Sequence, residues 1–323
     1  MRKILIISLF VLGLIIPNIN VKAVNVSNEE ELRAAIKQGG DITLTDNIEV
    51  TQSLVIDKDV NISGYYAILM QGDNTLMTVN SGNVTLDVNL IAGWNGKYIE
   101  WGYPGTDVVK GQGTGLVVNG GTVNFENAII FAGKLGLEVN GGTVTGNPGI
   151  SAGEYNYDNR TYSGGQGMII NGGNAELDDS GIYSGGTALT VNNGANVTLN
   201  GAEISSYEEN GIEVNGGTVS GNLTIVAGEE AENGTYSGGQ GMIVNGGNVE
   251  LDNPKIYSGG TALTVNNGAN VTLTAESYDT IIINSYEGNG IEVNNGANVT
   301  LNGAEINSYE GNGIEVNNGA NVT

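Results

Sequence analysis

The chain of 323 residues contains no cysteine, no histidine and only four prolines. Without cysteine it can form no disulfide, no thiol nucleophile and no thiolate metal site. Without histidine it lacks the commonest general base and the commonest metal-binding side chain. The fold must therefore be held together by apolar burial and backbone hydrogen bonds, and catalytic triads that need histidine or cysteine are excluded.

Basic residues are also scarce. The chain has 11 lysines and arginines against 35 aspartates and glutamates, which gives a net charge of −24. From Thr161 onward the only basic residue is Lys255, against 19 carboxylates. Such a surface repels nucleic acid and anionic membranes and favours cations and basic partners. We therefore expect no nucleic-acid partner, and plain solvation of a secreted surface is the other explanation of the charge.

The one long apolar run lies at the N-terminus. Arg2 and Lys3 precede the apolar residues 4–16, and Val21-Lys22-Ala23 then offers the small residues of a cleavage site. This pattern predicts a secretory signal peptide over residues 1–23. An N-terminal anchor helix is the alternative, although 13 apolar residues are few for a bilayer. We expect a secreted, extracellular protein whose mature chain inserts into no membrane.

Glycine is abundant, with 53 residues, and it marks an internal repeat. A motif of glycine, an apolar residue, any residue, valine, asparagine and a glycine-rich turn recurs every 21–31 residues. On a larger scale, residues 161–199 match residues 235–273 at 34 of 39 positions, so three short units form one duplicated block. The turn asparagines are Asn119, Asn140, Asn171, Asn192, Asn215, Asn245, Asn266, Asn294 and Asn317, with a looser copy at Asn80.

Each repeat has the pattern of short strands joined by tight corners. Ile291 and Val293 alternate with Glu292, which is the period of a half-buried strand, and Asn-Gly steps tolerate the positive φ of a corner. Asn-Gly also favours β-hairpins, but a meander has no reason to restore the same side chain at this spacing. A coil of three short strands does, because each turn lies on the previous one. The sequence therefore predicts an all-β parallel β-helix with stacked valines and a ladder of hydrogen-bonded asparagines.

The start of the mature chain predicts a cap for the first coil. We expect an amphipathic helix within residues 24–40, before a β-helix over residues 41–323. Ser27 and Glu30 have the spacing of a capping box, and Gly39-Gly40 would end the helix. The residues expected on its apolar face are Leu32, Ala35 and Ile36.

The segment "NEEELRAAIKQGGDITLTDNIEVTQSLVIDKDVNISG", followed by Asn/Gly-rich coils, resembles the pectate-lyase-like adhesive domain of bacterial surface proteins. Repetitive autotransporter passengers have a similar pattern. The resemblance implies a right-handed, pectin-lyase-like β-helix displayed at the cell surface and used for adhesion. It carries over no catalytic residue.

Carboxylates are the remaining candidates for chemistry. Polysaccharide lyases on this fold need clustered carboxylates for calcium and a basic residue, whereas hydrolases need several close aspartates. The chain offers only weak metal candidates, and its near-identical duplication suits a scaffold better than an active site. We expect the protein to have no enzymatic activity and no cofactor, although these carboxylates could bind calcium with a structural role. The candidates are Glu176 and Asp178, which would share a strand face, and their copies Glu250 and Asp252.

Tyrosines recur four to six residues before each repeat's apolar strand and would form an aromatic column if they were in register. Such a column could bind sugar rings or partner side chains, for which we single out Tyr183 and Tyr257. The alternative is that the stacked rings brace the corner of the coil. The members are Tyr162, Tyr183, Tyr207, Tyr236, Tyr257, Tyr286 and Tyr309.

A loop over residues 93–113 interrupts the repeat, and a smaller aromatic excursion follows over residues 154–162. Loops on a rigid scaffold often carry function, so we predict a recognition surface in the longer loop. The alternative is a lid whose tryptophans pack in a small core. The candidate binding residues are Trp94, Tyr98, Trp101 and Tyr103.

These observations favour a non-catalytic adhesin or cell-envelope scaffold that binds a host or cell-surface glycan or protein. The alternative function is a polysaccharide-active enzyme, a lyase or glycoside hydrolase, on the same fold. A spacer without a ligand is a third interpretation. Because the sequence stops inside a repeat at Thr323, we expect the C-terminus to be truncated, and the protein to be a monomer or part of a longer surface protein.

Overall fold

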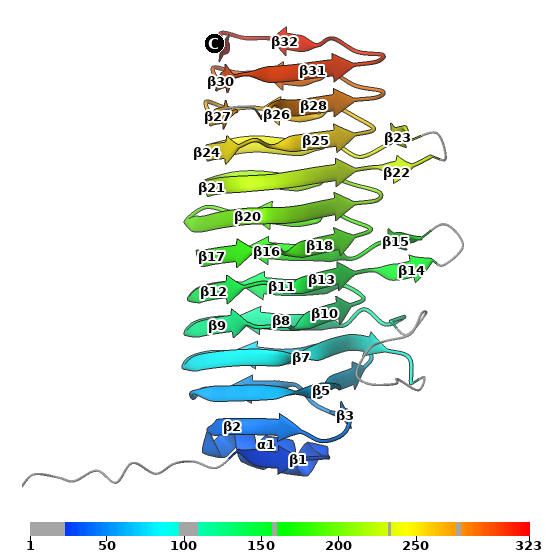
Figure 1. Ribbon diagram of the computed structural model, residues 1–323, viewed down its shortest axis with the longest axis vertical. Coiled ribbons are helices and arrows are strands. Elements are labelled where there is room, and N and C mark those ends of the chain that lie inside the picture. The colour runs from blue at the N-terminus through cyan, green and yellow to red at the C-terminus, as the bar shows by residue number, and fades with distance from the viewer. Residues whose placement is uncertain (1–22, 97–108, 157–159, 232–233, 276–278) are drawn as a thin grey trace, which may run out of the picture.

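The computed structural model describes residues 23–96, 109–156, 160–231, 234–275 and 279–323. These residues form a tall stack of coils with one helix at its N-terminal end (Figure 1). The predicted signal peptide lies almost wholly outside the described residues. In the described part of the chain, no helix is long and apolar enough to cross a membrane.

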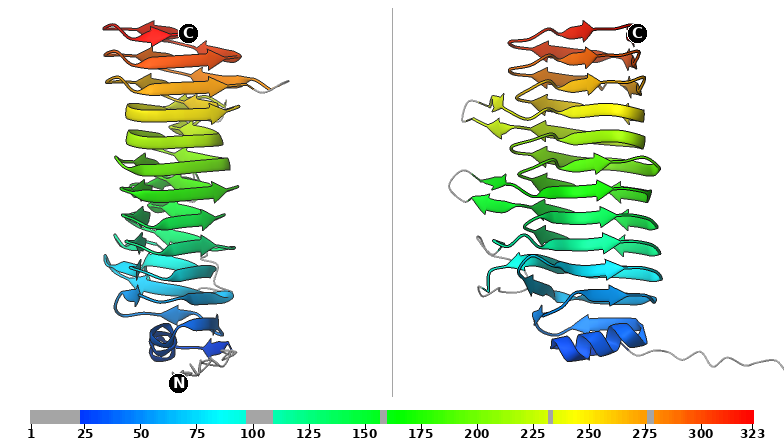
Figure 2. Two further views of the ribbon diagram at one scale, coloured as in Figure 1. Left: turned by 90° about the vertical axis from the view of Figure 1, so that its left-hand side faces the viewer. Right: turned by 180° about the vertical axis from the view of Figure 1, so that it is seen from behind.

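Each regular coil contains three short strands, as predicted. In one coil these are β8 (Thr114–Val118), β9 (Thr122–Phe125) and β10 (Ile129–Ala132). In the next they are β11 (Leu135–Val139), β12 (Thr143–Gly146) and β13 (Gly149–Ala152), each paired in parallel with its counterpart. Within the described residues, twenty-nine strands join in this way into one continuous sheet that winds around the axis. The side views show the same regular spacing of coils from end to end (Figure 2).

Three faces run along the stack. The first face contains β4 (Leu54–Ile56), β6 (Thr75–Val79), β8, β11, β16 (Gln166–Ile170), β19 (Leu189–Val191), β26 (Leu263–Val265), β29 (Ile291–Val293) and β32 (Ile314–Val316). The second contains β1 (Val24–Val26), β2 (Gly40–Leu44), β9, β12, β17 (Gly173–Asp178), β27 (Asn270–Thr274), β30 (Asn298–Asn302) and β33 (Asn321–Val322). The third contains β3 (Ile48–Glu49), β10, β13, β18 (Gly181–Ser184), β25 (Lys255–Ser258), β28 (Ile281–Ser285) and β31 (Ala304–Ser308).

Some strands continue around a corner and serve two or three faces. Strands β5 (Val60–Gln71), β7 (Asn83–Trp94) and β20 (Ala195–Ser206) serve the second and third faces. Strand β24 (Met242–Asp252) serves the first and second, and β21 (Ile212–Ala227) serves all three. Coils of 21 to 31 residues therefore keep one cross-section.

The core consists of inward side chains that stack on their own copies. On the first face the valine or isoleucine before each turn asparagine pairs with its counterpart in the next coil, as in Val118↔Val139 and Val139↔Ile170. All three side chains are fully buried. Burying such a side chain stabilises a fold by roughly 1.5–3 kcal/mol. This stacking explains why the sequence repeats, because a residue type that packs well on an identical residue can occupy the same position in every coil.

The predicted asparagine ladder is present along the edge of the first face. Each side-chain Nδ2 donates to the Oδ1 of the asparagine one coil before, over 2.7–3.3 Å. The bonds connect Asn80 to Asn317 without interruption, and Asn80 donates in turn to Oδ1 of Asp57 at 3.0 Å. The corner that follows uses left-handed backbone, as at Asn295 (φ 54°) and Gly296 (φ 72°).

The helix α1 (Glu29–Gln38) covers the N-terminal end of the stack, and Leu32, Ala35 and Ile36 are buried against it as predicted. The predicted start was wrong by one residue. Asn28 is the N-cap and accepts from Glu31 N at 3.0 Å, while Glu31 Oε2 accepts from Ser27 N at 2.8 Å. Asparagine caps as well as serine does, and the extended Val24–Val26 pairs with β2 instead of joining the helix.

Candidate functional site

One corner of the stack carries three excursions of the chain within the described residues, and we call it the excursion corner. It lies where the third face ends and the next first-face strand has yet to begin. The chain leaves here after β7, and again in two antiparallel hairpins, β14–β15 (Glu154–Asn156 with Thr161–Ser163) and β22–β23 (Glu229–Glu230 with Tyr236–Ser237). The hairpins project from the same edge (Figure 1). The predicted excursion at residues 154–162 is therefore confirmed.

Trp94 lies in a small apolar cluster outside the main core. It forms an antiparallel bridge with Val109 and packs with Phe131 against buried Ala67, Leu69 and Ile91 on the outside of the third face. This arrangement fits the lid interpretation of the 93–113 loop at its two ends. Tyr98, Trp101 and Tyr103 lie outside the described residues, so their role in binding stays a prediction.

The seven repeat tyrosines do not form a single column, because they occupy different positions in the coil. Tyr183 pairs with Ser205 within the third face, and Tyr257 pairs with Val226 and Asn284. Tyr207 comes two residues after Ser205, in the excursion corner, where its N–H donates to Ser184 O at 3.0 Å. The number of residues between each tyrosine and the following apolar strand did not reveal these different positions, because the turns that join tyrosine and strand differ in length.

Instead, six tyrosines gather in two separate clusters at the excursion corner. In the first, the ring centroid of Tyr162 lies 4.9 Å from that of Tyr155 and 5.8 Å from that of Tyr207. In the second, the centroid of Tyr286 lies 5.6 Å from that of Tyr236 and 5.0 Å from that of Tyr309. Each cluster joins a hairpin to later coils of the stack.

Each tyrosine cluster lines a hollow, and we call these the first and second tyrosine hollows. The first has a volume of about 210 Å³ and the second about 440 Å³. Tyr162, Tyr207, Glu208 and Glu229 line the first. Tyr236, Tyr286, Tyr309, Glu287 and Glu310 line the second.

A glutamate fastens each hairpin to the coil behind the hollow. Glu208 Oε2 accepts from Gly164 N at 3.0 Å, and Glu287 Oε2 accepts from Gly238 N at 3.3 Å. Gly164 and Gly238 hold the same place in the duplicated block. In the second hollow, Tyr286 Oη also donates to Gly234 O at 3.1 Å. The two hollows therefore repeat one construction.

Two tyrosines of the hollows have a raised pKa and so keep the phenolic proton more firmly than a free tyrosine. Burial, reinforced by the nearby phenols of Tyr162 and Tyr155, raises the pKa of Tyr207 to about 12. Burial likewise raises the pKa of Tyr286, with further contributions from Tyr309 and Glu230. Neutral rings keep the negative π-face that attracts cations.

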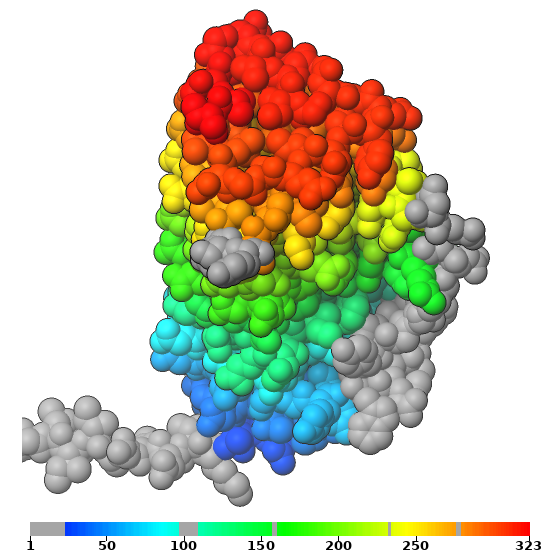
Figure 3. All heavy atoms as spheres, turned by 45° about the horizontal axis from the view of Figure 1, so that its top comes forward, coloured from blue at the N-terminus to red at the C-terminus, as the bar shows by residue number. Residues whose placement is uncertain are grey.

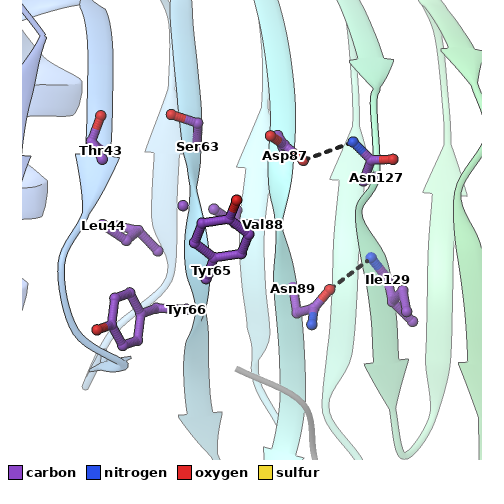
Figure 4. A pocket seen from close by; sticks show the side chains of 11 residues that line it. Thr43, Leu44, Ser63, Tyr65, Tyr66, Asp87, Val88, Asn89, Asn127 and Ile129 are labelled. Atoms are coloured by element: carbon purple, nitrogen blue, oxygen red, sulfur yellow. Dashed lines mark hydrogen bonds between the residues drawn. The ribbon is translucent and has the colours of Figure 1, made fainter. Parts of the chain in front are cut away.

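The sequence did not point to a further hollow of about 650 Å³ near the N-terminal end. Strand β5 carries Gly64, Tyr65 and Tyr66 between two pairs, Ser63↔Asp87 and Ala67↔Asn89, where β7 has Val88 alone. This bulge turns Tyr65 outward, where it is 88% exposed (Figure 4). The paired tyrosines break the period-two pattern of β5, which is the signal that could have revealed the bulge.

The metal candidates lie on the outer surface. Glu176 and Asp178 are exposed on one side of β17, as expected, and Asp178 Oδ1 accepts from Asn200 Nδ2 at 2.8 Å. Glu250 and Asp252 are likewise exposed on β24. Within the described residues, no group of three or more carboxylates is placed to hold a metal ion.

Comparison with known families matches residues 166–323 to the family described as "Right handed beta helix region". This region, just under half of the chain, is similar to that family. The N-terminal coils continue the same parallel pairing, so the described residues form an all-β right-handed β-helix, as the pectate-lyase-like resemblance implied. Comparisons with curated proteins and with solved structures gave no match. The family therefore establishes the fold of this β-helix and leaves its activity open.

Proposed function

We propose that this β-helix is a secreted, surface-displayed binding scaffold, an adhesin or cell-envelope protein, that performs no catalysis. The observation that carries the proposal is the repeated tyrosine hollow at one corner of a rigid stack. Each hollow joins aromatic faces to carboxylates on a framework held by backbone and asparagine ladders. Aromatic residues supply much of the contact energy at binding surfaces.

Two features of the sequence support export and binding over catalysis. Residues 1–23 have the pattern of a secretory signal peptide, although they lie almost wholly outside the described residues. The duplication of residues 161–199 as 235–273 supports binding, because two linked weak sites bind a repetitive surface more tightly than one site does.

Binding and catalysis are separated by one experiment. The mature protein, residues 24–323, is incubated with acidic and neutral polysaccharides with and without calcium, while unsaturated products and new reducing ends are measured. We expect neither product. In parallel, adherence of fluorescent beads coated with the protein to bacterial and host cells is counted, and we expect adherence above that of uncoated beads. Polysaccharide cleavage would favour the lyase or hydrolase alternative, and absence of adherence would favour a spacer.

A further inference from the structure

The two tyrosine hollows share a chemistry that selects one kind of ligand. The rings that line them are Tyr162 and Tyr207 in the first, with Tyr155 packed beside Tyr162, and Tyr236, Tyr286 and Tyr309 in the second. The charged side chains that line them are all glutamates. A tyrosine face and a carboxylate attract the same thing, a cation with an organic surface.

The surroundings strengthen this preference. Glu229 and Glu230 form the first strand of the second hairpin, and Glu230 adds to the raised pKa of Tyr236 and Tyr286 through its charge. Arg160 lies in the turn of the first hairpin, and beyond it Lys255 is the only basic residue to the end of the sequence. An anionic ligand such as an acidic polysaccharide would therefore be repelled, whereas a lysine or arginine side chain is drawn to the hollow.

The distance between the hollows follows from the coil register. The corner position of Tyr207 is taken in the following coils by Gly228, then Gly259, then Tyr286, as the pairs Ser206↔Ala227, Ala227↔Ser258 and Ser258↔Ser285 show. Three coils therefore separate Tyr207 from Tyr286. At about 4.8 Å per coil this is about 14 Å along the axis.

An extended peptide matches that distance with side chains of the correct direction. Residues i and i+4 of a strand point to the same side and lie about 14 Å apart, at about 3.4 Å per residue. Residues i and i+3 point to opposite sides. An α-helix rises only about 6 Å over the same four residues.

We propose that the two tyrosine hollows bind two lysine or arginine side chains, four residues apart, of an extended basic segment of a partner protein lying along the stack. Each cationic head lies against a tyrosine ring and beside a glutamate, with Tyr286 and Glu310 at the second hollow and Tyr207 and Glu229 at the first. This inference rests on the proposed binding function and names its partner class.

The test uses the mature chain and two synthetic peptides of the same composition. One has two arginines four residues apart in a serine/threonine background, and the other has them three residues apart. We expect the first to bind roughly tenfold or more tightly in calorimetric titration, because only it can occupy both hollows. Binding should weaken from low to high salt, because exposed charges are screened.

Matched variants link the binding to the rings. Tyr286→Leu and Tyr207→Leu remove the π-face but keep apolar bulk, and each should weaken binding of the first peptide about 2- to 5-fold beyond its Phe counterpart. Glu310→Gln keeps the shape of the second hollow and should reduce the salt dependence. Unchanged thermal unfolding of these variants shows that the hollows remain folded. If the Leu variants lose both binding and folding, Glu310→Gln decides whether the second hollow binds the peptide.

Several outcomes would overturn the inference. Equal affinity for the two peptides, or Leu variants that bind like the wild type, would indicate non-specific attraction to an acidic surface. Binding of a neutral oligosaccharide that the Leu variants abolish would make the hollows sugar sites. Wild-type protein that adheres to cells but binds neither peptide would overturn this inference alone. Protein that binds the first peptide but adheres to nothing would contradict the proposed function alone.

Discussion

At the scale of single residues, the asparagine ladder has a direction that makes its members unequal. Every asparagine of the ladder donates toward the N-terminus, those from Asn80 to Asn294 also accept from the following coil, and Asp57 at the end only accepts. A carboxylate cannot donate, so it is compatible with the end of the ladder and incompatible with its middle. This asymmetry gives a test in which the same two residue types are exchanged in opposite directions.

We expect Asn245→Asp to lower the free energy of unfolding by about 1–3 kcal/mol, because Asn245 donates to Asn215 at 3.0 Å and a carboxylate would repel that acceptor. Asp57→Asn keeps the acceptor for Asn80 and should change stability by less than about 0.5 kcal/mol. Urea denaturation followed by circular dichroism measures both. Equal losses would show that the ladder contributes little beyond backbone pairing.

The raised pKa of Tyr207 predicts a loss of stability in alkali. Above pH 10 the unfolded chain releases the phenolic proton readily, while the folded chain holds it until pH is about 12. The stability present below pH 10 is therefore lost as the pH rises from 10 to 12. Tyr207→Phe has no proton to release, so its urea midpoint should fall less than that of the wild type over this range. Parallel curves for the two proteins would contradict the burial of the hydroxyl.

At the scale of elements, glycine holds each hairpin close to the coil that follows it. A Cβ at Gly259 would clash with the backbone of Gly238 in the second hairpin. At Gly313, by contrast, no other heavy atom lies within 4 Å of a Cβ. The close approach of the hairpin backbone therefore requires glycine at position 259, whereas position 313 has room for a side chain.

We expect Gly259→Ala to displace the β22–β23 hairpin and leave the coils folded. Limited proteolysis should cut the variant faster within residues 229–237, and the melting temperature should change by only a few degrees. Gly313→Ala is the control and should be cut like the wild type. Proteolysis of Gly259→Ala throughout the coils would show that the hairpin root is part of the core.

The capping helix protects an edge that would otherwise be open to other chains. Leu32 is fully buried between α1 and the first coil, while Arg33 holds Glu29 at 2.7 Å. Burial by itself would raise the pKa of Glu29, but hydrogen bonds from Arg33 and Thr51 outweigh it and lower the pKa. We expect Leu32→Ala to cost about 2–5 kcal/mol and to increase aggregation on heating, measured by light scattering. A variant that unfolds earlier without aggregating would argue against protection of the edge.

At the scale of the whole molecule, the duplicated block behaves as a removable section of three coils. Deleting residues 166–239 joins Gly165 to Gln240, and the five residues before each junction are identical. The register on all three faces is kept, together with one hairpin and the second-hollow pair Tyr286 and Tyr309. Figure 3 looks onto the last coil (red), which stays in place and in which Ile314 and Val316 are 44% and 46% exposed.

We expect this deletion to fold with an unchanged circular dichroism spectrum per residue. Small-angle scattering should show a particle shorter by about 14 Å, at about 4.8 Å per coil. Deletion of residues 166–249 is the control, because it joins the excursion corner directly to the second-face part of β24, leaves out a first-face strand and should not fold. If the three-coil deletion also fails to fold, stability is not a sum over neighbouring coils.

The sequence by itself determined the coil. Alternating apolar residues, Asn-Gly corners and a returning Val-Asn pair specify strands, turns and stacking, because each residue packs on its own copy one coil away. The capping helix was predictable for the same local reasons, and its N-cap was misplaced by one residue because Ser27 and Asn28 cap equally well.

Only the tertiary structure decided which tyrosines meet. Tyr207 lies beside Tyr162 and Tyr286 beside Tyr236, across coils of unequal length, while Tyr183 and Tyr257 remain within the third face. A hairpin adds residues to a coil without adding height to the stack. The number of residues between two tyrosines therefore does not tell how many coils separate them. The bulge that exposes Tyr65 is hidden for a related reason, since two extra residues in one coil matter only against the coil that they pair with.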